Sequence, residues 1–588
     1  MKFQYNKCDF SDYAVLLRCG TCFFSSERRL FMNRCKRLAA LILAVVMSFS
    51  LLSGCGESVG EGLQLSVSVG PRVTTLDPIY AEDLESQNVL VHLYENLMRV
   101  SPDGNGGSTV VNGMAKSVDV EENVDGTVTY TFRLRSAKWS DGETVTAQDF
   151  VYAWRRLVHP ASHAPYATLL SVVVGYQEAR NSGDMSLMQI SAKNETTFEV
   201  TLNGNYDWFL TEVCTSPATM PLREDVIQTL KEAGIQAGGE NGALPWWADP
   251  TALVTNGPYQ ATAYDAEETL QLTANEQYHS EQSGPGSITF HFADSAEEAW
   301  DLYKNKTVDA VWPLPEERLS ELASDETWSP IPELSTYSVV YHSDRGVFAD
   351  PLIRQAFALS VDRTALMEVA DVTAVAAEGL VPPGVPENEE GDFRTVGGPL
   401  FENDAELYAE SRELARETLS QAGYNSGWEL GELEYLYVDE GHNGLIAEAL
   451  CDQWSNTLGV RVRTRGVTHQ ELWTALRSGE YTFAGVNLEA PGNDAECFLM
   501  QWTSDAQNNV VHYENSAYDT LMAIIASAPD GTARMGCLHD AEALLLGDYA
   551  VSPLYTKRTD WELRDDLMGA VRDARGWFCF SNVVKRPV

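Results

Sequence analysis

One stretch of this chain is apolar enough to enter a lipid bilayer, and it lies close to the N-terminus. Residues 38–52 read LAALILAVVMSFSLL. A transmembrane helix needs roughly 20 apolar residues, so this stretch is too short to span a membrane comfortably. The sequence after it holds no comparable run, which excludes a transporter with several membrane spans. Everything after residue 52 must therefore fold around hydrophobic cores of its own.

The residues on either side of this stretch are typical of a secretion signal. Arg34, Lys36 and Arg37 stand directly before it, as the basic segment of a signal peptide does. It ends in Leu52-Ser53-Gly54-Cys55, which resembles the bacterial lipobox, whose cysteine is diacylated and becomes the first residue of the mature protein. We therefore expect lipidation at Cys55, and the lipid would hold the protein at a membrane surface without spanning it.

This pattern divides the first 62 residues into three segments. Residues 32–54 are predicted to be a lipoprotein signal peptide, and residues 55–62 a lipidated tether. Residues 1–31 are interpreted as a mis-called N-terminal extension, because a signal peptide rarely carries a long preamble. The expected location is extracytoplasmic, at the cell surface or in the periplasm.

The chain is strongly acidic. Its 588 residues include 85 Asp and Glu against 41 Lys and Arg, which gives a formal net charge of −44. A nucleic-acid-binding protein needs a basic surface that releases counterions, so we expect no nucleic acid partner. The same charge disfavours adhesion to anionic lipid, and the lipid anchor is left as the expected contact with the membrane.

Helical and strand-like patterns alternate along the chain, most regularly in its second half. Such alternation is typical of an α/β fold, and here it predicts a largely parallel sheet. In the first half, apolar residues at helical spacing predict a helix over residues 86–99. Thr146 is expected to be the N-cap of a helix that runs through Asp149 to Leu157. The alternating segments of the second half are a helix over 405–422, a strand over 433–438, a helix over 443–457, a strand over 460–463, a helix over 469–477 and a strand over 481–487.

The sequence lacks the short motifs that mark common enzymes. It has no GxGxxG followed by a helix, no GxxxxGKS/T, no GxSxG and no HExxH. His159 and His163 are four residues apart, but Pro160 and Pro165 argue against a shared helix face, so we expect no metal site. Carboxylates are abundant, yet no spacing among them favours acid–base catalysis. We therefore expect no catalytic residues and no cofactor.

Aromatic residues favour a binding protein instead. Several of the 14 Trp and 24 Tyr residues stand beside glycine, proline or turn residues. Aromatic side chains in such places suit a cleft that holds a ligand by stacking and shape. The residues by themselves thus indicate a multi-domain α/β binding protein outside the cytoplasm.

Six strings along the chain narrow this interpretation. They are, in order, LDPIYAEDLESQNVLVHLYENLMRV, KWSDGETVTAQDFVYAWRRL, TNGPYQ, FADPLIRQAFALSVDRTALM, ARETLSQAGY and VHYENSAYDTLM. Together they resemble the oligopeptide-binding proteins of ABC importers, which are family 5 extracellular solute-binding lipoproteins. The resemblance runs from about Leu63 to about Leu563.

This resemblance implies a two-lobed α/β fold of the type II periplasmic-binding-protein kind, with an extra inserted domain and a two-strand hinge. In such a fold the ligand is buried between the lobes, and the hinge closes around it. The boundaries that the resemblance implies are a lobe 1 core domain of residues 62–107, 246–334 and 552–588, an inserted domain of residues 108–245 and a lobe 2 of residues 335–551.

The resemblance also assigns ligand-binding positions in lobe 1. The extended segment after LDP, which contributes backbone to peptide ligands, corresponds to Glu82, Asp83 and Leu84. The tyrosine of an SPYA-like string corresponds to Tyr166. Asn256 and Gly257 belong to the turn where the chain returns to the first lobe, and they complete the lobe 1 candidates.

In lobe 2, the ligand-pairing strand corresponds to residues 485–489, with Asn487, Leu488 and Glu489 as candidates. Peptide receptors of this family carry a Trp-x-x-Asp pattern whose aspartate pairs with the α-ammonium of the peptide. An ungapped match puts Leu488 at the tryptophan and Pro491 at the aspartate, so the charge is missing there. Glu489 or Asp494 is expected to replace it, since a buried ammonium needs a carboxylate.

The implied function is that of a lipid-anchored receptor. It would capture a ligand, oligopeptides above all, between two lobes and deliver it to the permease subunits of an ABC importer, acting as a monomer. The alternatives keep this architecture but change the ligand to a nickel chelate, an opine or a sugar, or make the protein a sensor of a peptide signal. An enzyme on the same fold is least favoured, because no motif supports it.

Overall fold

The computed structural model describes residues 62–103, 107–232, 245–325, 328, 330–370, 373–388, 391–401, 403–490, 492–506, 509–525 and 531–587. The predictions for the N-terminal extension, the signal peptide, Cys55 and Pro491 concern residues outside these ranges. Gly62–Val588 form one compact unit. None of the helices in the described ranges is long and apolar enough to cross a membrane.

The first lobe is built on a six-stranded sheet around the strand that opens the described chain. β1 (Gln64–Val69) lies parallel to both β10 (Ser287–His291) and β11 (Ala310–Trp312). Its alternating sequence QLSVSV buries Leu65 and Val67 in the core. The sheet order is β20 (Glu562–Leu563), β11, β1, β10, β9 (Thr269–Ala274) and β8 (Tyr259–Asp265).

A second, antiparallel sheet of the same lobe carries helix α3 (Ala147–Val158). Thr146 and Asp149 form a capping box at the start of this helix, so the N-cap expected at Thr146 is confirmed. The helix turns its apolar face, including Phe150 and Trp154, toward Phe198 of the sheet. The sheet order is β4 (Ala115–Glu122), β5 (Val128–Leu134), β7 (Thr197–Leu202) and β6 (Ile190–Asn194).

The helix expected over residues 86–99 is shorter and begins earlier. It is α2 (Leu84–Leu93), and the chain is extended from Tyr94 onward. Tertiary contacts end the helix, because Gly257 donates its backbone N–H to the carbonyl of Leu93 and the Asn256 side chain bonds the backbone of Glu95 on both sides. Residues 98–102 then form β2, which pairs with β3 (Ser108–Asn112) as a hairpin.

The second lobe is built on a mixed sheet, so the largely parallel sheet expected from the sequence is wrong. Among its described strands, β16 (Glu432–Val438) pairs parallel with β17 (Arg461–Val467) and β18 (Phe483–Glu489), and the other pairs are antiparallel. The alternation of helices and strands in the sequence predicts the parallel strands. It does not reveal that the long strands β12 and β19 join the same sheet in antiparallel pairing. The sheet order is β13 (Val375–Ala376), β19 (Val551–Thr559), β12 (Ile331–Tyr341), β18, β16 and β17.

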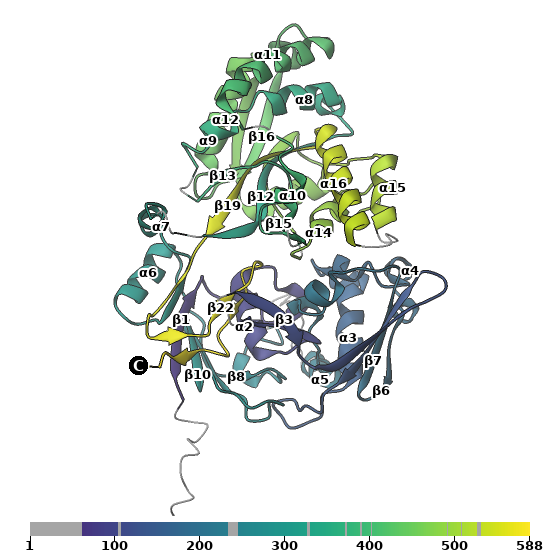
Figure 1. Cartoon of the computed structure of the whole chain (residues 1–588), viewed down its shortest axis with the longest axis vertical. Coiled ribbons are helices and arrows are strands. Elements are labelled where there is room, and N and C mark those ends of the chain that lie inside the picture. Colours follow the sequence, from purple (N-terminus) through teal and green to yellow (C-terminus); the bar gives the residue numbers. More distant parts are fainter. Residues whose placement is uncertain are drawn as a thin grey trace, which may run out of the picture. The chain divides into compact units, whose positions relative to one another are not determined.

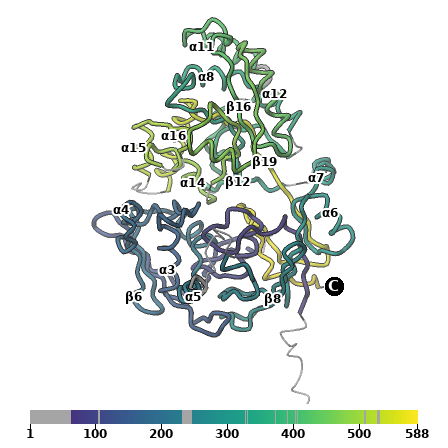
Figure 2. Tube along the Cα trace, turned by 180° about the vertical axis from the view of Figure 1, so that it is seen from behind, coloured from purple at the N-terminus to yellow at the C-terminus, as the bar shows by residue number. Residues whose placement is uncertain are grey.

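Two long strands carry the chain between the lobes. β12 enters lobe 2 after the lobe 1 strand β11, and β19 leaves it before the lobe 1 strand β20. The two strands pair antiparallel from Ile331–Thr559 onward and run side by side in the cartoon and in the Cα trace (Figures 1 and 2). Their register shifts between Pro332 and Thr336. The fold is thus α/β and two-lobed, with a two-strand hinge.

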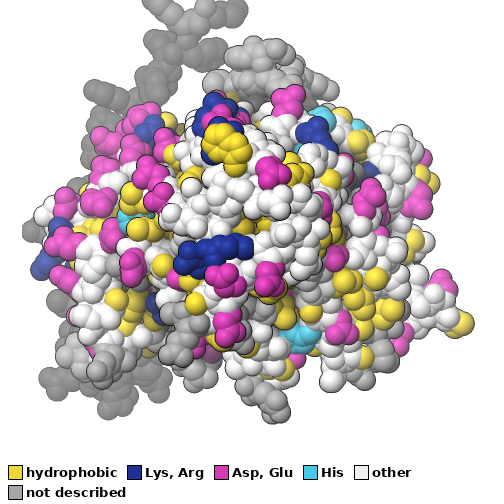
Figure 3. Space-filling view, turned by 90° about the horizontal axis from the view of Figure 1, so that it is seen from above, with side chains coloured by type: hydrophobic (Ala, Val, Ile, Leu, Met, Phe, Trp, Pro, Cys, Tyr) yellow, Lys and Arg dark blue, Asp and Glu magenta, His cyan; other side chains and the backbone are white. Residues whose placement is uncertain are grey.

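Each face of the lobe 2 sheet packs against its own helices. Tyr435 of β16 belongs to the core formed with α8 (Pro351–Leu359) and α12 (Asn443–Leu458). Its neighbour Leu436 points to the opposite core, formed with α13 (His469–Ser478) and α16 (Gly531–Gly547). Acidic side chains are scattered over the face seen from above in Figure 3 and greatly outnumber basic ones, in keeping with the charge of the chain.

Candidate ligand-binding site

Strand β18 has an unpaired edge where it approaches lobe 1. It pairs with β12 from Phe483 to Glu489, but with β16 only at Phe483 and Ala484. Within the described residues, therefore, no strand covers the other edge of residues 485–489. An extended ligand could add to this edge through main-chain hydrogen bonds.

Side chains alternate along this part of β18. Leu488 is buried in the lobe 2 core, while Asn487 and Glu489 point to the opposite side and are exposed. The Nδ2 of Asn487 donates a 3.0 Å hydrogen bond to Oε1 of Glu489. Leu488 can therefore meet a ligand only through its backbone, and the two polar residues can meet it with their side chains.

The Glu489 carboxylate is reached by water and yet has protein on most sides. Burial is the main cause that raises its pKa, and the negative charges of Glu333 and Glu82 raise it further. Glu82 belongs to lobe 1 and Glu333 to the start of β12, so the charges of acids from two other segments act on Glu489.

Tyr166 completes this cluster from lobe 1. The residue is half-buried, and burial raises the pKa of its hydroxyl. The charges of Glu489 and Glu82 raise this pKa further, which places the hydroxyl close to both carboxylates. The structure thus brings together four residues expected from the sequence: Glu82, Tyr166, Asn487 and Glu489.

The segment that precedes α2 is only partly extended. Asp83 is the N-cap of α2, and its carboxylate accepts from the Ser86 backbone N–H at 2.8 Å and from the Thr74 hydroxyl. Leu84 is already the first helical residue, which differs from the extended conformation expected for it. Of these positions, Glu82 is exposed and its side chain is the one that faces the cluster.

Asn256 and Gly257 lie at the other end of α2, away from this cluster. Asn256 is buried, and its side chain is occupied with the Glu95 backbone. A Cβ on Gly257 would stand 2.5 Å from the Leu93 carbonyl carbon. The Asn256 side chain and the Gly257 backbone N–H thus hold the end of a helix.

Asp494 is engaged in a buried ion pair. It caps α14 (Ala495–Leu499), and its Oδ1 lies 2.6 Å from Arg534, which also contacts Glu496 at 2.9 Å. Glu496 in turn accepts a 2.9 Å hydrogen bond from Nε1 of Trp208 in lobe 1. Among the two acids expected to replace the missing aspartate, Glu489 is therefore the one whose carboxylate faces the cluster.

Two charged residues near the cluster were not foreseen. Glu333 comes from the hinge strand, and Arg572 comes from the C-terminal segment as part of β22 (Val571–Arg572). The guanidinium of Arg572 lies over Trp312 at 5.2 Å, and its Nε and Nη1 are buried without a hydrogen bond. Burial lowers the pKa of Arg572, while Glu333 acts in the opposite direction. No motif near either residue could have signalled this proximity.

The lobes also touch beside this cluster. Glu212, on the π-helix η5 (Phe209–Val213), accepts from the Asn493 backbone N–H of lobe 2 at 2.8 Å. The same carboxylate oxygen lies 3.1 Å from Arg575 of the C-terminal segment. This contact and the Trp208–Glu496 hydrogen bond link lobe 1 to the loop and the helix α14 that follow β18.

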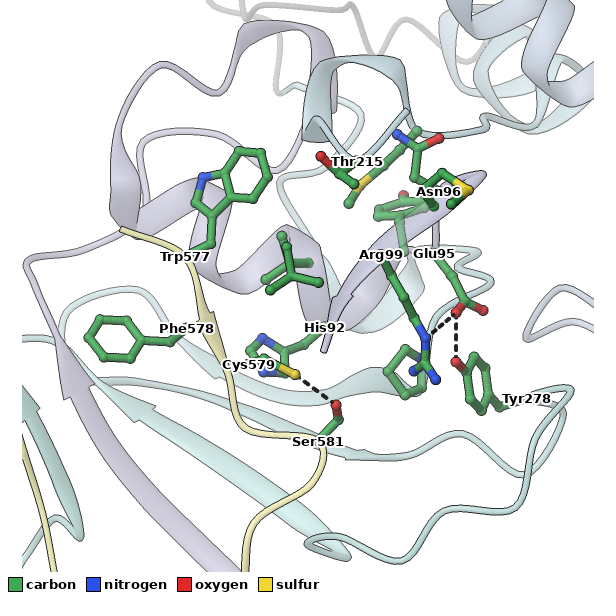
Figure 4. A pocket seen from close by; sticks show the side chains of 16 residues that line it. His92, Glu95, Asn96, Arg99, Thr215, Tyr278, Trp577, Phe578, Cys579 and Ser581 are labelled. Carbon is green, nitrogen blue, oxygen red and sulfur yellow. Dashed lines mark hydrogen bonds and ion pairs between the residues drawn. The ribbon is translucent and has the colours of Figure 1, made fainter. Parts of the chain in front are cut away.

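A small cavity lies beside α2, which supplies part of its wall (Figure 4). It offers about 50 Å³ that water could occupy, and its walls include Met98, Thr215 and Trp577. Its acid, Glu95, is satisfied by Tyr278 at 2.9 Å, by His279 and by Arg99 at 3.5 Å. This cavity therefore offers little to a polar ligand. Across the described residues, no cluster of three or more His, Cys, Asp or Glu side chains is arranged to hold a metal ion.

Comparison with known proteins identifies the family of the chain. Residues 109–510 match the family described as bacterial extracellular solute-binding proteins, family 5. The chain belongs to this family, whose members are extracellular proteins that bind solutes.

Individual relatives resemble the chain over most of its length. The oligopeptide-binding protein OppA of Bacillus subtilis is 27% identical over 92% of this chain and 98% of its own. A probable deoxycholate-binding periplasmic protein, YgiS of Escherichia coli, is 26% identical over 82% and 85%. The crystal structure of Haemophilus influenzae OppA in complex with the peptide RPPGFSPFR superposes with a TM-score of 0.73 at 25% identity, over 89% of this chain and 99% of that one.

Proposed function

We propose that this protein captures peptides between its lobes and delivers them to an ABC import permease. The observation that carries this proposal is the meeting of the open β18 edge with Glu82 and Tyr166 of the opposite lobe. Main-chain pairing to the edge would give affinity for extended peptides of varied sequence, because it does not depend on their side chains.

Glu489 is the residue proposed to hold the ammonium of the peptide. Its carboxylate lies beside Glu333 and Glu82, so a cation there would be attracted by several charges and would relieve their repulsion. Asp494 is the weaker candidate, since it already pairs with Arg534. The proposed ligand-binding set is therefore Glu82, the backbone of Asp83, Tyr166, Asn487, the backbone of Leu488, and Glu489.

A non-peptide ligand is the second candidate, because one relative is named for deoxycholate. Deoxycholate is an anion and would meet the like charges of Glu82, Glu333 and Glu489. The acidic cluster therefore favours a ligand with a positive end, and among the alternatives a free peptide fits it best.

The setting of the receptor is part of the proposal. A lipid on Cys55 would anchor the chain, the signal peptide of residues 32–54 would export it, and the ligand-binding part would act as a monomer outside the cytoplasm. The proposed domains are a lobe 1 core of residues 62–107, 246–334 and 552–588, an inserted domain of 108–245 and a lobe 2 of 335–551. The β2–β3 hairpin spans the first of these boundaries.

Calorimetric titration of the purified protein with pairs of peptides tests this function. The two peptides of a pair have the same sequence, and one has a free N-terminus while the other has an acetylated one. We expect the free form to bind more tightly by about tenfold or more, because acetylation removes the charge that Glu489 holds. Equal binding of both forms would remove the ammonium role, and no binding of any peptide would remove the peptide proposal.

A further inference from the structure

A second pocket lies entirely within lobe 2, apart from the cluster at Glu489. It offers about 320 Å³ that water could occupy. Its walls come from the end of α8, the start of α9 (Arg363–Leu366), the residues before α11 (Ala405–Gln421), and α16. Because one lobe supplies all of these walls, the pocket does not depend on closure of the hinge.

The base of this pocket is a buried arginine without an acidic partner. Arg363 is 6% exposed, and no ion pair of its guanidinium occurs anywhere in the described part of the chain. Its Nε donates to the Pro553 carbonyl at 2.6 Å, and its Nη2 reaches the Ser552 hydroxyl at 3.4 Å. A buried cation that is held only by neutral groups is costly unless an anion joins it.

Aromatic contacts hold this arginine in place. Its guanidinium stacks on Phe401 at 4.1 Å, and Tyr549 also lines the pocket. Burial lowers the pKa of Arg363 to about 10, which still leaves it charged at neutral pH. Its Nη1 makes no hydrogen bond to any described residue, so one nitrogen of a fixed, planar cation remains for a ligand.

An unpartnered acceptor lies in the same pocket. Nδ2 of Asn403 donates to the Ala377 carbonyl at 3.0 Å, which fixes the amide, while Oδ1 is buried without a donor. Buried amide oxygens in folded proteins nearly always have a donor, so this atom calls for one. Two residues of the pocket wall thus carry an unused donor and an unused acceptor.

The remaining lining divides into an apolar part and an acidic part. Leu359, Leu400 and Leu546 supply aliphatic surface, and Asp362 and Asp404 supply carboxylates. Asp362 caps α9 through one carboxylate oxygen, Oδ1, at 3.0 Å from the Ala365 N–H. A ligand that satisfies all of these groups needs an anion, a cationic donor and an apolar body within a few ångströms of one another.

We propose that this pocket binds a free amino acid with an apolar side chain, its carboxylate on Arg363 and its ammonium on Asn403 and Asp362. A zwitterion matches the two unused polar groups together, whereas an inorganic anion would leave Asn403 unsatisfied and meet two carboxylates. The volume of about 320 Å³ accommodates a molecule of this size. The pocket would make the receptor sensitive to free amino acids independently of its peptide ligand.

Titration of the full-length protein with L-leucine and L-phenylalanine tests this proposal. The same titration with leucinamide, with N-acetyl-leucine and with inorganic phosphate shows which end of the ligand matters. We expect both amino acids to bind below about 10 mM, and each blocked derivative to bind about tenfold more weakly or worse, since each leaves one buried group unpaired.

The variant Asn403→Ala removes the acceptor, and Asn443→Ala is its matched control. Asn443 is another lobe 2 asparagine whose Nδ2 donates to a backbone carbonyl, that of Val438 at 3.1 Å. We expect Asn403→Ala to weaken amino acid binding about tenfold, Asn443→Ala to leave it unchanged, and both to keep the affinity for peptides.

Several results would overturn the proposal. Amino acid binding that Asn403→Ala leaves intact but Glu489→Gln abolishes would place the ligand between the lobes. Leucinamide or N-acetyl-leucine binding as well as leucine would exclude recognition of a zwitterion. Binding of phosphate but of no amino acid would leave an anion site only.

Discussion

Nε1 of Trp208 donates a 2.9 Å hydrogen bond to Oε2 of Glu496, and this bond joins the two lobes. Both residues are buried, and Glu496 also pairs with Arg534 at 2.9 Å. The bond lies just beyond the strand whose open edge is the proposed ligand platform. It therefore stabilises the arrangement in which ligand groups from both lobes meet.

Trp208→Phe is expected to weaken ligand binding without touching the ligand. The substitution removes the indole N–H but keeps a large aromatic ring, so the closed arrangement loses about 1 kcal/mol and the affinity falls about threefold to tenfold. Calorimetry measures this change. Trp428→Phe, at an exposed lobe 2 tryptophan, is the control and should bind normally. Unchanged affinity in Trp208→Phe would show that this bond does not contribute to closure.

Binding of a peptide with a free N-terminus should depend on pH through Glu489. Burial and neighbouring acids raise the pKa of this carboxylate, so it loses its charge at a higher pH than an ordinary glutamate. The attraction is present above that pKa and is lost as the pH falls through it. Dissociation constants measured between about pH 8 and pH 5 should therefore rise toward the acidic end. In Glu489→Gln, the affinity for the peptide should be lower at every pH and nearly independent of pH. If the dissociation constant of this variant changed with pH as much as that of the parent, another titrating group would cause the pH dependence.

Glu85 should make the protein less stable as the pH rises through neutrality. The half-buried carboxylate packs over Gly70, and burial raises its pKa to about 7. Because the folded state binds this proton more tightly than the unfolded state, the stabilisation is complete below the unfolded pKa and is lost as the pH passes the folded one. At pH 8, Glu85→Gln should therefore be more stable than the parent by about 1–3 kcal/mol, and at pH 4 the two should be alike.

Urea unfolding at both values of pH measures this difference. Glu121→Gln, at an exposed carboxylate of β4, is the control and should match the parent at both. A constant difference between Glu85→Gln and the parent at both values of pH would contradict the titration of Glu85.

The variant Gly257→Ala tests whether Gly257 supports the fold or takes part in ligand binding. The new Cβ would stand 2.5 Å from the Leu93 carbonyl carbon, and backbone would have to shift. We expect a loss of stability of about 2 kcal/mol or more, seen as a lower melting temperature, with unchanged ligand affinity of the folded protein. Gly536→Ala, where a Cβ meets nothing within 4 Å, should keep or raise the melting temperature. A stable Gly257→Ala that binds ligand poorly would restore the role first expected for this turn.

The sequence allowed the family, the two-lobed fold and the local helix start at Thr146 to be predicted. Patterns of short range determine such features, as the capping box shows. The end of α2 could not be predicted, because Asn256 and Gly257 set it from far along the chain. The same holds for Glu333 and Arg572, which approach the proposed ligand site only through the fold. Likewise, no local pattern shows that Asp494 pairs with Arg534 while Glu489 stays available.

Because the C-terminal segment returns to lobe 1, it determines the order in which the two lobes can fold during synthesis. β20 joins the edge of the first sheet at β11, and Phe580 stacks on His92 of α2 at 5.6 Å. The core of lobe 1 thus contains residues from both ends of the described chain. As synthesis proceeds from the N-terminus, all residues of lobe 2 are made before the C-terminal residues that complete the lobe 1 core. Lobe 1 is therefore the first lobe to be synthesised and the last to fold. Loss of the final thirty or so residues would therefore leave an intact second lobe attached to an open first one, exposed to proteases and chaperones.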